Sequence, residues 1–291
     1  DGLEMFGFPY ATGDDVRSSP AVADLDKNNS LELIIGSHDG SLHILSGFGQ
    51  QLATHQVNGS INGSPAAVDL DQDGDLEVVF TSYNGSTGDV HAIHHNGSTF
   101  YGFPVYLNEK MVGGAAAGDL DGDGYPEIVV CTDDDNVYAI KKDGSIMTGF
   151  PFTSTDRFFN APTLVDLDGD SDLEIVVGNR RGTLQVLHHD GTEMASYEVG
   201  DDIRGGISVA DLNDDGSYEL LVTSYEDMIH VWNPIDGEEL EGWPVDLGSN
   251  ALTEPATADL DNDGDLEVVA ATRSGMAYVF HHDATPYNNF P

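Results

Sequence analysis

The sequence predicts an all-β fold, a six-bladed β-propeller of four-stranded antiparallel blades. The main observation is an acidic motif that occurs six times. Its copies begin at Asp24, Asp69, Asp119, Asp166, Asp211 and Asp259, so that they are separated by 45, 50, 47, 45 and 48 residues. This period suits one propeller blade. The segments between the motifs carry strand and hairpin signals and no helical apolar period. We therefore expect residues 1–291 to form a single domain.

The first repeat shows the expected order of strands. Residues 20–24, "PAVAD", form a short inner strand, "LELIIGS" follows the acidic loop, and "SLHIL" follows the turn "HDG". A fourth strand follows a second turn, which is Asn-Gly or Asp-Gly in most later repeats, a strong hairpin signal. The N-terminal "DGLEMFGFP" is similar to the fourth-strand pieces "NGSTFYGFP" and "DGSIMTGFP". We expect this segment to pair with the last blade, which would close the ring and remove a free sheet edge.

The chain is strongly acidic. Its formal net charge is −42, from 52 acidic and 10 basic residues, so it would repel nucleic acid and anionic membrane surfaces. No apolar run reaches the length of a membrane span, and we expect no membrane insertion. The one cysteine, Cys131, follows the apolar run "EIVV". We expect it to be a buried strand residue rather than a nucleophile.

The acidic motif has the chemistry of a calcium loop. In "DLDGDGYPE", Asp119, Asp121 and Asp123 alternate, Gly124 permits a sharp turn, and Glu127 closes the set. Hard oxygen ligands in this number suit Ca²⁺ better than Mg²⁺, which keeps more of its waters. Without a cation, each close pair of carboxylates would cost on the order of 1 kcal/mol even in water.

The motif DxDxDGxx[D/E], placed between the first two strands of each repeat, resembles the FG-GAP repeats of the integrin α-subunit β-propeller and its prokaryotic relatives. The resemblance implies that positions one, three, five and nine supply side-chain oxygens and position seven a backbone carbonyl. It implies up to six Ca²⁺ ions. The implied ligand sets are Asp24, Asp26, Asn28 and Glu32; Asp69, Asp71, Asp73 and Glu77; Asp119, Asp121, Asp123 and Glu127; Asp166, Asp168, Asp170 and Glu174; Asp211, Asn213, Asp215 and Glu219; and Asp259, Asp261, Asp263 and Glu267.

The six loops differ in completeness. The second, third and sixth match the pattern fully, whereas the fourth has Ser171 at the glycine position, where the backbone is expected to be left-handed. The first and fifth loops, residues 24–32 and 211–219, replace one carboxylate with Asn28 or Asn213. We therefore expect these two to bind calcium most weakly. The ions are expected to be structural rather than catalytic.

Histidines recur in pairs, and a polar or amphipathic residue recurs within the third strand of each repeat. We interpret both sets as structural, since a zinc site needs three or four convergent ligands and the pairs lie in different blades. The pairs are His94 and His95, His188 and His189, and His281 and His282; the third-strand residues are His43, His91, Tyr138, Gln185, His230 and Tyr278.

All six arginines fall in the second connection of a blade or in the crossing to the next blade, the side opposite the acidic loops. Guanidinium groups suit carboxylates and sulfates, and nearby aromatic rings could stack on sugars. The alternative is local pairing, because an Asp precedes several of the arginines. The predicted ligand-face residues are Arg17, Arg157, Phe158, Phe159, Arg180, Arg181, Arg204 and Arg273.

These observations favour an extracellular, calcium-stabilised ligand-binding or adhesion module. Its ligand would be an acidic or polar polysaccharide or a protein loop, and its location secreted, cell-surface or periplasmic. No G-x-S-x-G, H-E-x-x-H or phosphate-loop motif is present, which argues against an enzyme. The alternatives are a polysaccharide lyase or other propeller enzyme, or a rigid scaffold domain. We expect a monomer or a part of a larger surface protein.

Overall fold

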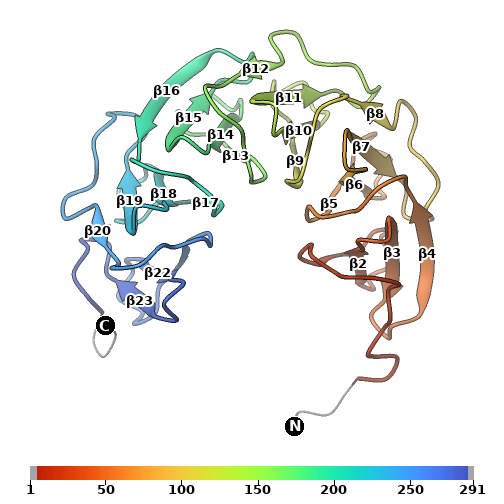
Figure 1. The fold of residues 1–291 in the computed structure, drawn as a ribbon, viewed down its shortest axis with the longest axis horizontal. Coiled ribbons are helices and arrows are strands. Elements are labelled where there is room, and N and C mark those ends of the chain that lie inside the picture. Colours follow the sequence, from red (N-terminus) through yellow and green to blue (C-terminus); the bar gives the residue numbers. More distant parts are fainter. Residues whose placement is uncertain (1–4, 288–291) are drawn as a thin grey trace. The chain divides into compact units, whose positions relative to one another are not determined.

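A computed structural model describes residues 5–287. Within this range the chain forms six antiparallel sheets and no helix, so none that could cross a membrane (Figure 1). Two compact units, Asp1–Thr153 and Ser154–Pro291, each contain three of the sheets. We describe each unit separately.

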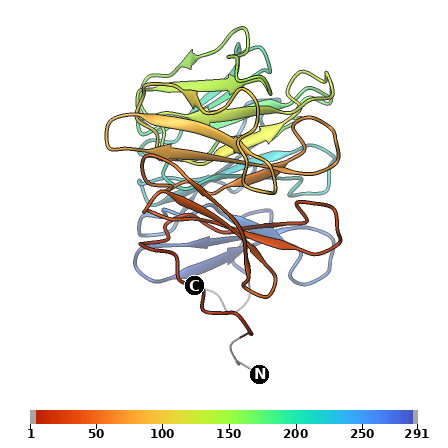
Figure 2. The ribbon, with the colours of Figure 1, turned by 90° about the vertical axis from the view of Figure 1, so that its right-hand side faces the viewer.

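Unit 1 (Asp1–Thr153) has three four-stranded sheets, each with its strands in chain order. In the side view, connections emerge at both ends of the strands (Figure 2). The strands are β1 (Ala21–Ala23), β2 (Glu32–Gly36), β3 (Ser41–Ser46) and β4 (Gln51–Gln56); β5 (Ala66–Val68), β6 (Glu77–Tyr83), β7 (Gly88–Ile93) and β8 (Val105–Tyr106); and β9 (Ala115–Gly118), β10 (Glu127–Cys131), β11 (Asn136–Ile140) and β12 (Phe152–Thr153).

Unit 2 (Ser154–Pro291) has two four-stranded sheets and one sheet in which three strands are described. The order is again that of the chain. The strands are β13 (Thr163–Val165), β14 (Glu174–Gly178), β15 (Thr183–Leu187) and β16 (Glu193–Glu198); β17 (Ile207–Ala210), β18 (Glu219–Thr223), β19 (Met228–Trp232) and β20 (Val245–Asp246); and β21 (Ala256–Ala258), β22 (Glu267–Ala271) and β23 (Ala277–Phe280).

The predicted first, second and third strands are confirmed, and the fourth strands differ in length. β4 and β16 have six residues each, whereas β8, β12 and β20 have two. Each short strand follows an aromatic-Pro pair, such as Phe103-Pro104 before β8. Proline has no N–H to donate to the ladder, so pairing begins only after it. The expected pairing of the N-terminal segment with the last blade is not confirmed: residues 5–9 form no strand, and the last sheet has three strands in the described part of the chain. The rest of the two segments, residues 1–4 and 288–291, lies outside the described residues.

Apolar contacts between neighbouring sheets form the core within each unit. All five residues of β10 are buried, and Val79 and Val90 of the second sheet belong to one cluster with Ile128 and Val130 of the third. A strand covered on both faces is apolar throughout rather than alternating. Cys131 is buried as predicted, and its burial raises the pKa of the thiol.

The polar residues of the third strands connect each sheet to an adjacent segment. The Tyr138 hydroxyl donates to Glu109 Oε1 at 2.6 Å, and Glu109 lies in the crossing from the preceding sheet. The Tyr278 hydroxyl donates to the Leu247 carbonyl at 2.7 Å in the same way. His91 lies near His55 of β4, with 6.3 Å between ring centroids. The predicted role in packing between neighbouring sheets is confirmed at these positions.

Candidate metal centres and ligand face

The six acidic loops join the first strand of each sheet to the second. Position six has a positive φ in every loop, which a glycine adopts without the steric cost of a Cβ. The angle is 66° at Asn29 and 81° at Ser171, the two positions where another residue replaces glycine. The left-handed backbone expected at Ser171 is confirmed.

Backbone N–H groups fix the carboxylates of each loop. In the third loop the Tyr125 N–H donates to Asp123 Oδ1 at 2.8 Å and the Gly124 N–H to Asp119 Oδ2 at 2.9 Å. The Asp123 N–H donates to Asp121 Oδ1 at 3.2 Å. Such Asx-type turns explain why aspartate and asparagine alternate here. The loop is therefore ordered by its own side chains.

The glutamate at position nine is buried at the first residue of the second strand in every sheet. It is at most 4% exposed in all six repeats. Its Oε2 accepts a hydrogen bond from the N–H of the leucine that follows the first aspartate, as between Leu120 and Glu127 at 3.1 Å and between Leu212 and Glu219 at 2.9 Å. The other four pairs are Leu25 and Glu32, Leu70 and Glu77, Leu167 and Glu174, and Leu260 and Glu267.

Burial and neighbouring negative charges raise the pKa values of these glutamates. Burial, together with the neighbouring Asp121, raises the pKa of Glu127 to about 7. Burial, together with Asp215 and Asp211, raises the pKa of Glu219 to about 7. Burial also raises the pKa of Glu32, Glu77 and Glu174. The loops thus hold carboxylates in places where a negative charge is unfavourable without a cation.

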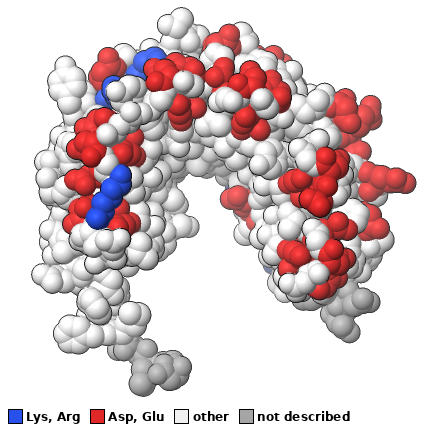
Figure 3. Space-filling model, turned by 180° about the vertical axis from the view of Figure 1, so that it is seen from behind, with Lys and Arg blue, Asp and Glu red and all other residues white. Residues whose placement is uncertain are grey.

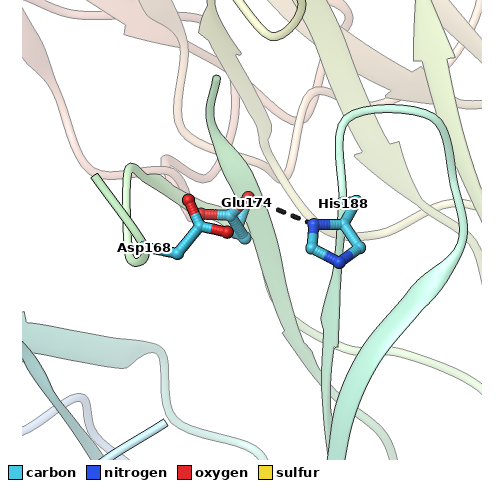
Figure 4. A group of neighbouring side chains, drawn as sticks. All are labelled: Asp168, Glu174 and His188. Atoms are coloured by element: carbon cyan, nitrogen blue, oxygen red, sulfur yellow. Dashed lines mark ion pairs between the residues drawn. The ribbon is translucent and has the colours of Figure 1, made fainter. Parts of the chain in front are cut away.

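The loops bring ligand atoms of positions one, three and nine together. In several groups of three side chains, each side chain offers one ligand atom, and the three atoms all lie within 4.8 Å of one another. Figure 4 shows a further group, in which Asp168 and Glu174 point toward each other beside His188. The groups at positions one, three and nine are Asp24, Asp26 and Glu32; Asp69, Asp71 and Glu77; and Asp119, Asp121 and Glu127.

The donor set fits a hard cation. Oδ1 of Asp24, Asp69 and Asp119 is buried without a hydrogen-bond partner, and so is Oε1 of Glu219. A buried oxygen that has neither a hydrogen-bond partner nor a bound cation lowers the stability of the folded state. All of these ligand atoms are oxygens, which Ca²⁺ prefers. The residues that would hold the ion therefore include the predicted ones at positions one, three and nine.

The histidine pairs contact the acidic loops, which the sequence interpretation missed. The first histidine of each pair faces the position-nine glutamate: Nδ1 of His94 lies 2.9 Å from Glu77 Oε1, and Nδ1 of His281 lies 3.1 Å from Glu267 Oε1. The second histidine faces position seven, as in His282 and Asp265 at 2.9 Å. The constant spacing between histidine pair and loop was the available signal. These contacts support a structural role, although His188 and His281 also belong to the groups described above.

The third loop has a lysine where the second, fourth and sixth loops have a histidine. Nζ of Lys141 lies 3.2 Å from Asp121 Oδ2 and 3.7 Å from Glu127 Oε1. Both acids belong to the predicted ligand set. The third loop therefore carries a cation of its own beside a complete ligand set, and this cation partly compensates Asp121 and Glu127. On the face in Figure 3, acidic side chains form separate clusters and basic side chains appear in few places.

Three arginines of unit 2 form a continuous series of contacts with two aromatic rings. The Arg204 guanidinium lies over Phe159 at 5.4 Å and over Tyr225 at 5.0 Å, measured to the ring centroids. Arg157 lies over the same Phe159 ring at 5.7 Å. Arg273 donates to the Tyr225 hydroxyl at 3.1 Å. We call these five residues the arginine–aromatic series.

One carboxylate neutralises part of this surface. Oδ2 of Asp202 accepts from Arg204 at 2.7 and 3.1 Å, and its Oδ1 lies 3.5 Å from Arg180 Nε. Among residues 5–287, Arg157, Arg181 and Arg273 form no ion pair with a carboxylate. Local pairing with a carboxylate thus accounts for Arg180 and Arg204, whereas Arg157, Arg181 and Arg273 remain candidates for a binding face.

Two of the predicted ligand-face residues have other roles. Phe158 is 2% exposed and forms a β-bridge with Asn179, so the expectation that its ring is available to a ligand is wrong. Adjacent residues of an extended segment point in opposite directions, and the core takes Phe158 while Phe159 stays at the surface. Arg17, in unit 1, pairs with Asp15 at 3.3 Å.

The prediction that the second connections and the crossings lie together, on the side opposite the acidic loops, is confirmed. The crossing to each sheet is tied by backbone hydrogen bonds to the connection between that sheet's second and third strands. The Arg180 N–H donates to the Arg157 carbonyl at 2.9 Å and the Arg273 N–H to the Asn250 carbonyl at 2.9 Å. The histidine contacts place the third connections beside the acidic loops.

A family model for FG-GAP-like repeats matches residues 69–130, 119–177, 166–222 and 211–270, well over half of the chain. The chain belongs to the FG-GAP-like repeat family. The four matches overlap, and each begins at the first aspartate of one acidic loop and extends into the second strand of the next sheet. The FG-GAP-like repeats are thus defined by the loops described above. A comparison with curated protein sequences finds no match.

Solved structures show that these FG-GAP-like repeats have a β-propeller fold. BamB from Moraxella catarrhalis aligns with a TM-score of 0.66 and 16% identity, over 92% of this chain and 73% of that one. BBS1N, solved in complex with ARL6DN, aligns with a TM-score of 0.66 and 13% identity, over 93% and 81%. The V. cholerae biofilm matrix protein Bap1 aligns with a TM-score of 0.62 and 24% identity, over 84% and 42%. At these identities the likeness concerns the fold alone.

Proposed function

We propose that this FG-GAP-like propeller is a calcium-stabilised binding module that takes an anionic polysaccharide on the arginine–aromatic series of unit 2. The observation that carries the ligand proposal is that Arg157 lies over the partly exposed Phe159 and Arg273 contacts the partly exposed Tyr225, neither arginine being paired with a carboxylate, in a chain of net charge −42. Guanidinium groups bind carboxylates and sulfates, and aromatic rings stack on sugars. Calcium dependence favours a secreted, cell-surface or periplasmic setting.

Calcium would have a structural role in the proposed module. The bound ion would supply positive charge to the buried glutamates and would hold the first strand of a sheet against the second. The second and sixth loops have complete ligand sets and no lysine in contact with their glutamate, although Nζ of Lys27 lies 3.8 Å from Asp69 Oδ2 in the second loop. We propose these two as the strongest sites. The first and fifth loops remain the weakest, because an asparagine replaces one carboxylate.

We also propose that the six sheets are six blades of one closed ring. The sixth sheet has three strands in the described part of the chain, which leaves an edge of β23 for a fourth strand. The N-terminal segment contains the Phe-Pro pair that precedes other fourth strands. Closure would remove an exposed edge.

A polysaccharide lyase is the second candidate, and Tyr225 is the observation that favours it. Its hydroxyl accepts a hydrogen bond from Arg273, and Arg204 lies over its ring. The phenolate of Tyr225 would take the C5 proton of a uronate as the C4–O bond breaks, and the phenol so formed would give this proton to the leaving oxygen. Incubation with pectin or alginate, followed at the absorbance of the unsaturated uronate, tests this activity. A rigid scaffold domain would show neither binding nor this absorbance.

The ligand proposal predicts that Arg157→Ala combined with Arg273→Ala weakens binding of an acidic polysaccharide about tenfold or more. Each substitution removes a charge that no carboxylate neutralises, and charge-assisted contacts are worth about 1.5–3 kcal/mol each. Calorimetric titration with polygalacturonate and with heparin, in calcium, measures the effect. Arg17→Ala in unit 1 is the matched control and should change little. Equal affinity of the double variant and the parent would contradict the proposal.

The calcium proposal predicts opposite effects of Lys141→Met in the absence and presence of calcium. Without calcium, the variant loses the ammonium group that compensates Asp121 and Glu127, so it melts at a lower temperature than the parent. With calcium, removal of a positive charge beside the site tightens binding at the third loop, by about tenfold (about 1.4 kcal/mol) for charges several Å apart in a polar surrounding. Melting curves in EDTA and in calcium measure both effects. The same sign of change in both conditions would refute it.

A further inference from the structure

Unit 1 contains a polar cavity that is separate from the arginine–aromatic series. Its volume is about 620 Å³, within the range of small-molecule sites. It lies between the β2–β3 connection, the β4–β5 crossing and the β6–β7 connection. Residues from each contribute: His38 and Asp39 from the first, Asn58 to Asn62 from the second, and Tyr83 to Gly85 from the third, with Arg17 at the edge.

Backbone pairing fixes the floor of this cavity. The Ser60 N–H donates to the Tyr83 carbonyl at 2.9 Å, and the Tyr83 N–H donates back to the Ser60 carbonyl at 2.9 Å. Gly59 has a φ of 130°, and a Cβ there would come within 2.6 Å of the Tyr83 backbone. Two neighbouring sheets therefore meet here at a distance that only glycine permits. The cavity is preformed, which lowers the entropy cost of binding.

Several polar groups around the cavity have hydrogen-bond donors or acceptors that no other protein group uses. Among residues 5–287, the Asn58 amide and the Tyr83 hydroxyl form no hydrogen bond with another protein group. His38 has one distant partner, Asp14, at 3.9 Å. The charge of Arg17 is balanced by Asp15, and Asp39 adds a carboxylate. The wall is thus rich in donors and acceptors and carries little net positive charge.

We propose that this cavity binds a neutral sugar unit. Sugar hydroxyls both donate and accept, as the amide, imidazole, carboxylate and phenol of the lining require. The Tyr83 ring offers one flat apolar surface for a pyranose. Val112 is the one aliphatic side chain of the lining, so an apolar ligand finds little surface. A phosphate or a polyanion meets Asp39 in the lining, and the one arginine of the lining, Arg17, is already paired with Asp15.

The test uses protein made without N-glycosylation, because Asn58, Asn62 and Asn84 each begin an Asn-Gly-Ser sequon. An array of neutral oligosaccharides is probed in calcium, and the strongest neutral trisaccharide is then titrated by calorimetry. At least one neutral glycan is expected to bind. Asn58→Ala and Tyr83→Phe should each weaken its binding about three- to tenfold, the loss expected for one hydrogen bond.

Matched variants outside the cavity serve as controls. Asn96→Ala changes another Asn-Gly turn of the second sheet, and Tyr101→Phe changes a tyrosine of unit 1 that is 84% exposed. Both should bind the trisaccharide like the parent, and so should the Arg157→Ala and Arg273→Ala double variant, which separates this proposal from the proposed function. The proposal is overturned if the folded protein binds no neutral glycan, if it binds only acidic glycans or peptides, or if Asn58→Ala behaves like Asn96→Ala.

Discussion

Excess EDTA is expected to lower the melting temperature of the protein by about 15 °C or more relative to a sample in millimolar calcium. A site saturated at a hundred times its Kd contributes about 2.7 kcal/mol. Two or three such loops contribute about 5–8 kcal/mol, and a chain of this size shifts by roughly 2–4 °C per kcal/mol. The physical reason is that each loop holds several carboxylates around buried oxygens without a partner, such as Asp69 Oδ1 and Glu219 Oε1.

Calorimetry or circular dichroism at neutral pH measures this shift. Returning calcium should restore the melting temperature, whereas magnesium at the same concentration should restore it only in part, because it prefers to keep its waters. Asp71→Asn with Asp261→Asn, in two complete loops, should reduce the calcium effect. The same melting temperature in EDTA and in calcium would refute the assignment of the six loops.

In EDTA, the stability of the protein should fall as the pH rises from about 4.5 to 7. Burial raises the pKa of Glu127 and of Glu219 from the ordinary 4.5 to about 7. Between these values the folded state holds protons that the unfolded state has released, so unfolding becomes easier as the pH increases. The stabilisation is fully present below pH 4.5 and is lost as the pH passes through 7. Each glutamate contributes about 3 kcal/mol of this change.

Calcium should flatten or reverse this dependence of stability on pH, because the ion binds the ionised carboxylates and opposes their protonation. Urea unfolding at pH 5, 6, 7 and 8, in EDTA and in calcium, measures both curves. Glu219→Gln should remove part of the slope in EDTA, and Glu109→Gln, outside the loops, is the control variant. A stability in EDTA that increases from pH 5 to pH 8 would contradict the prediction.

The strands and loops were predictable because their signals are local. Six copies of one motif fix where each acidic loop begins, and the glutamate of position nine is in every case the first residue of the second strand. The left-handed backbone at Ser171 also followed from its position within the motif. Such features depend on turn chemistry and on the alternation of side chains along a strand, which neighbouring residues already determine.

Other parts of the site depended on residues far apart in the sequence. The β10–β11 pairing brings the ammonium group of Lys141 to Asp121, which lies 20 residues away along the chain. Packing decided that Phe158 is buried while Phe159 stays at the surface, although both side chains are apolar. The polar cavity of unit 1 depends on three connections from two sheets. No local pattern contains that information.

By itself, the sequence determined an all-β protein of FG-GAP-like repeats with six acidic loops, because the repeat period, the turn residues and the alternating carboxylates are properties of short segments. Tertiary structure alone decided which charges are compensated. Asp202 approaches Arg180, Lys141 approaches the third loop, and Arg157 and Arg273 are left without a carboxylate. The reason is that electrostatic pairing falls off over a few Å, and only folding determines which distant side chains come that close.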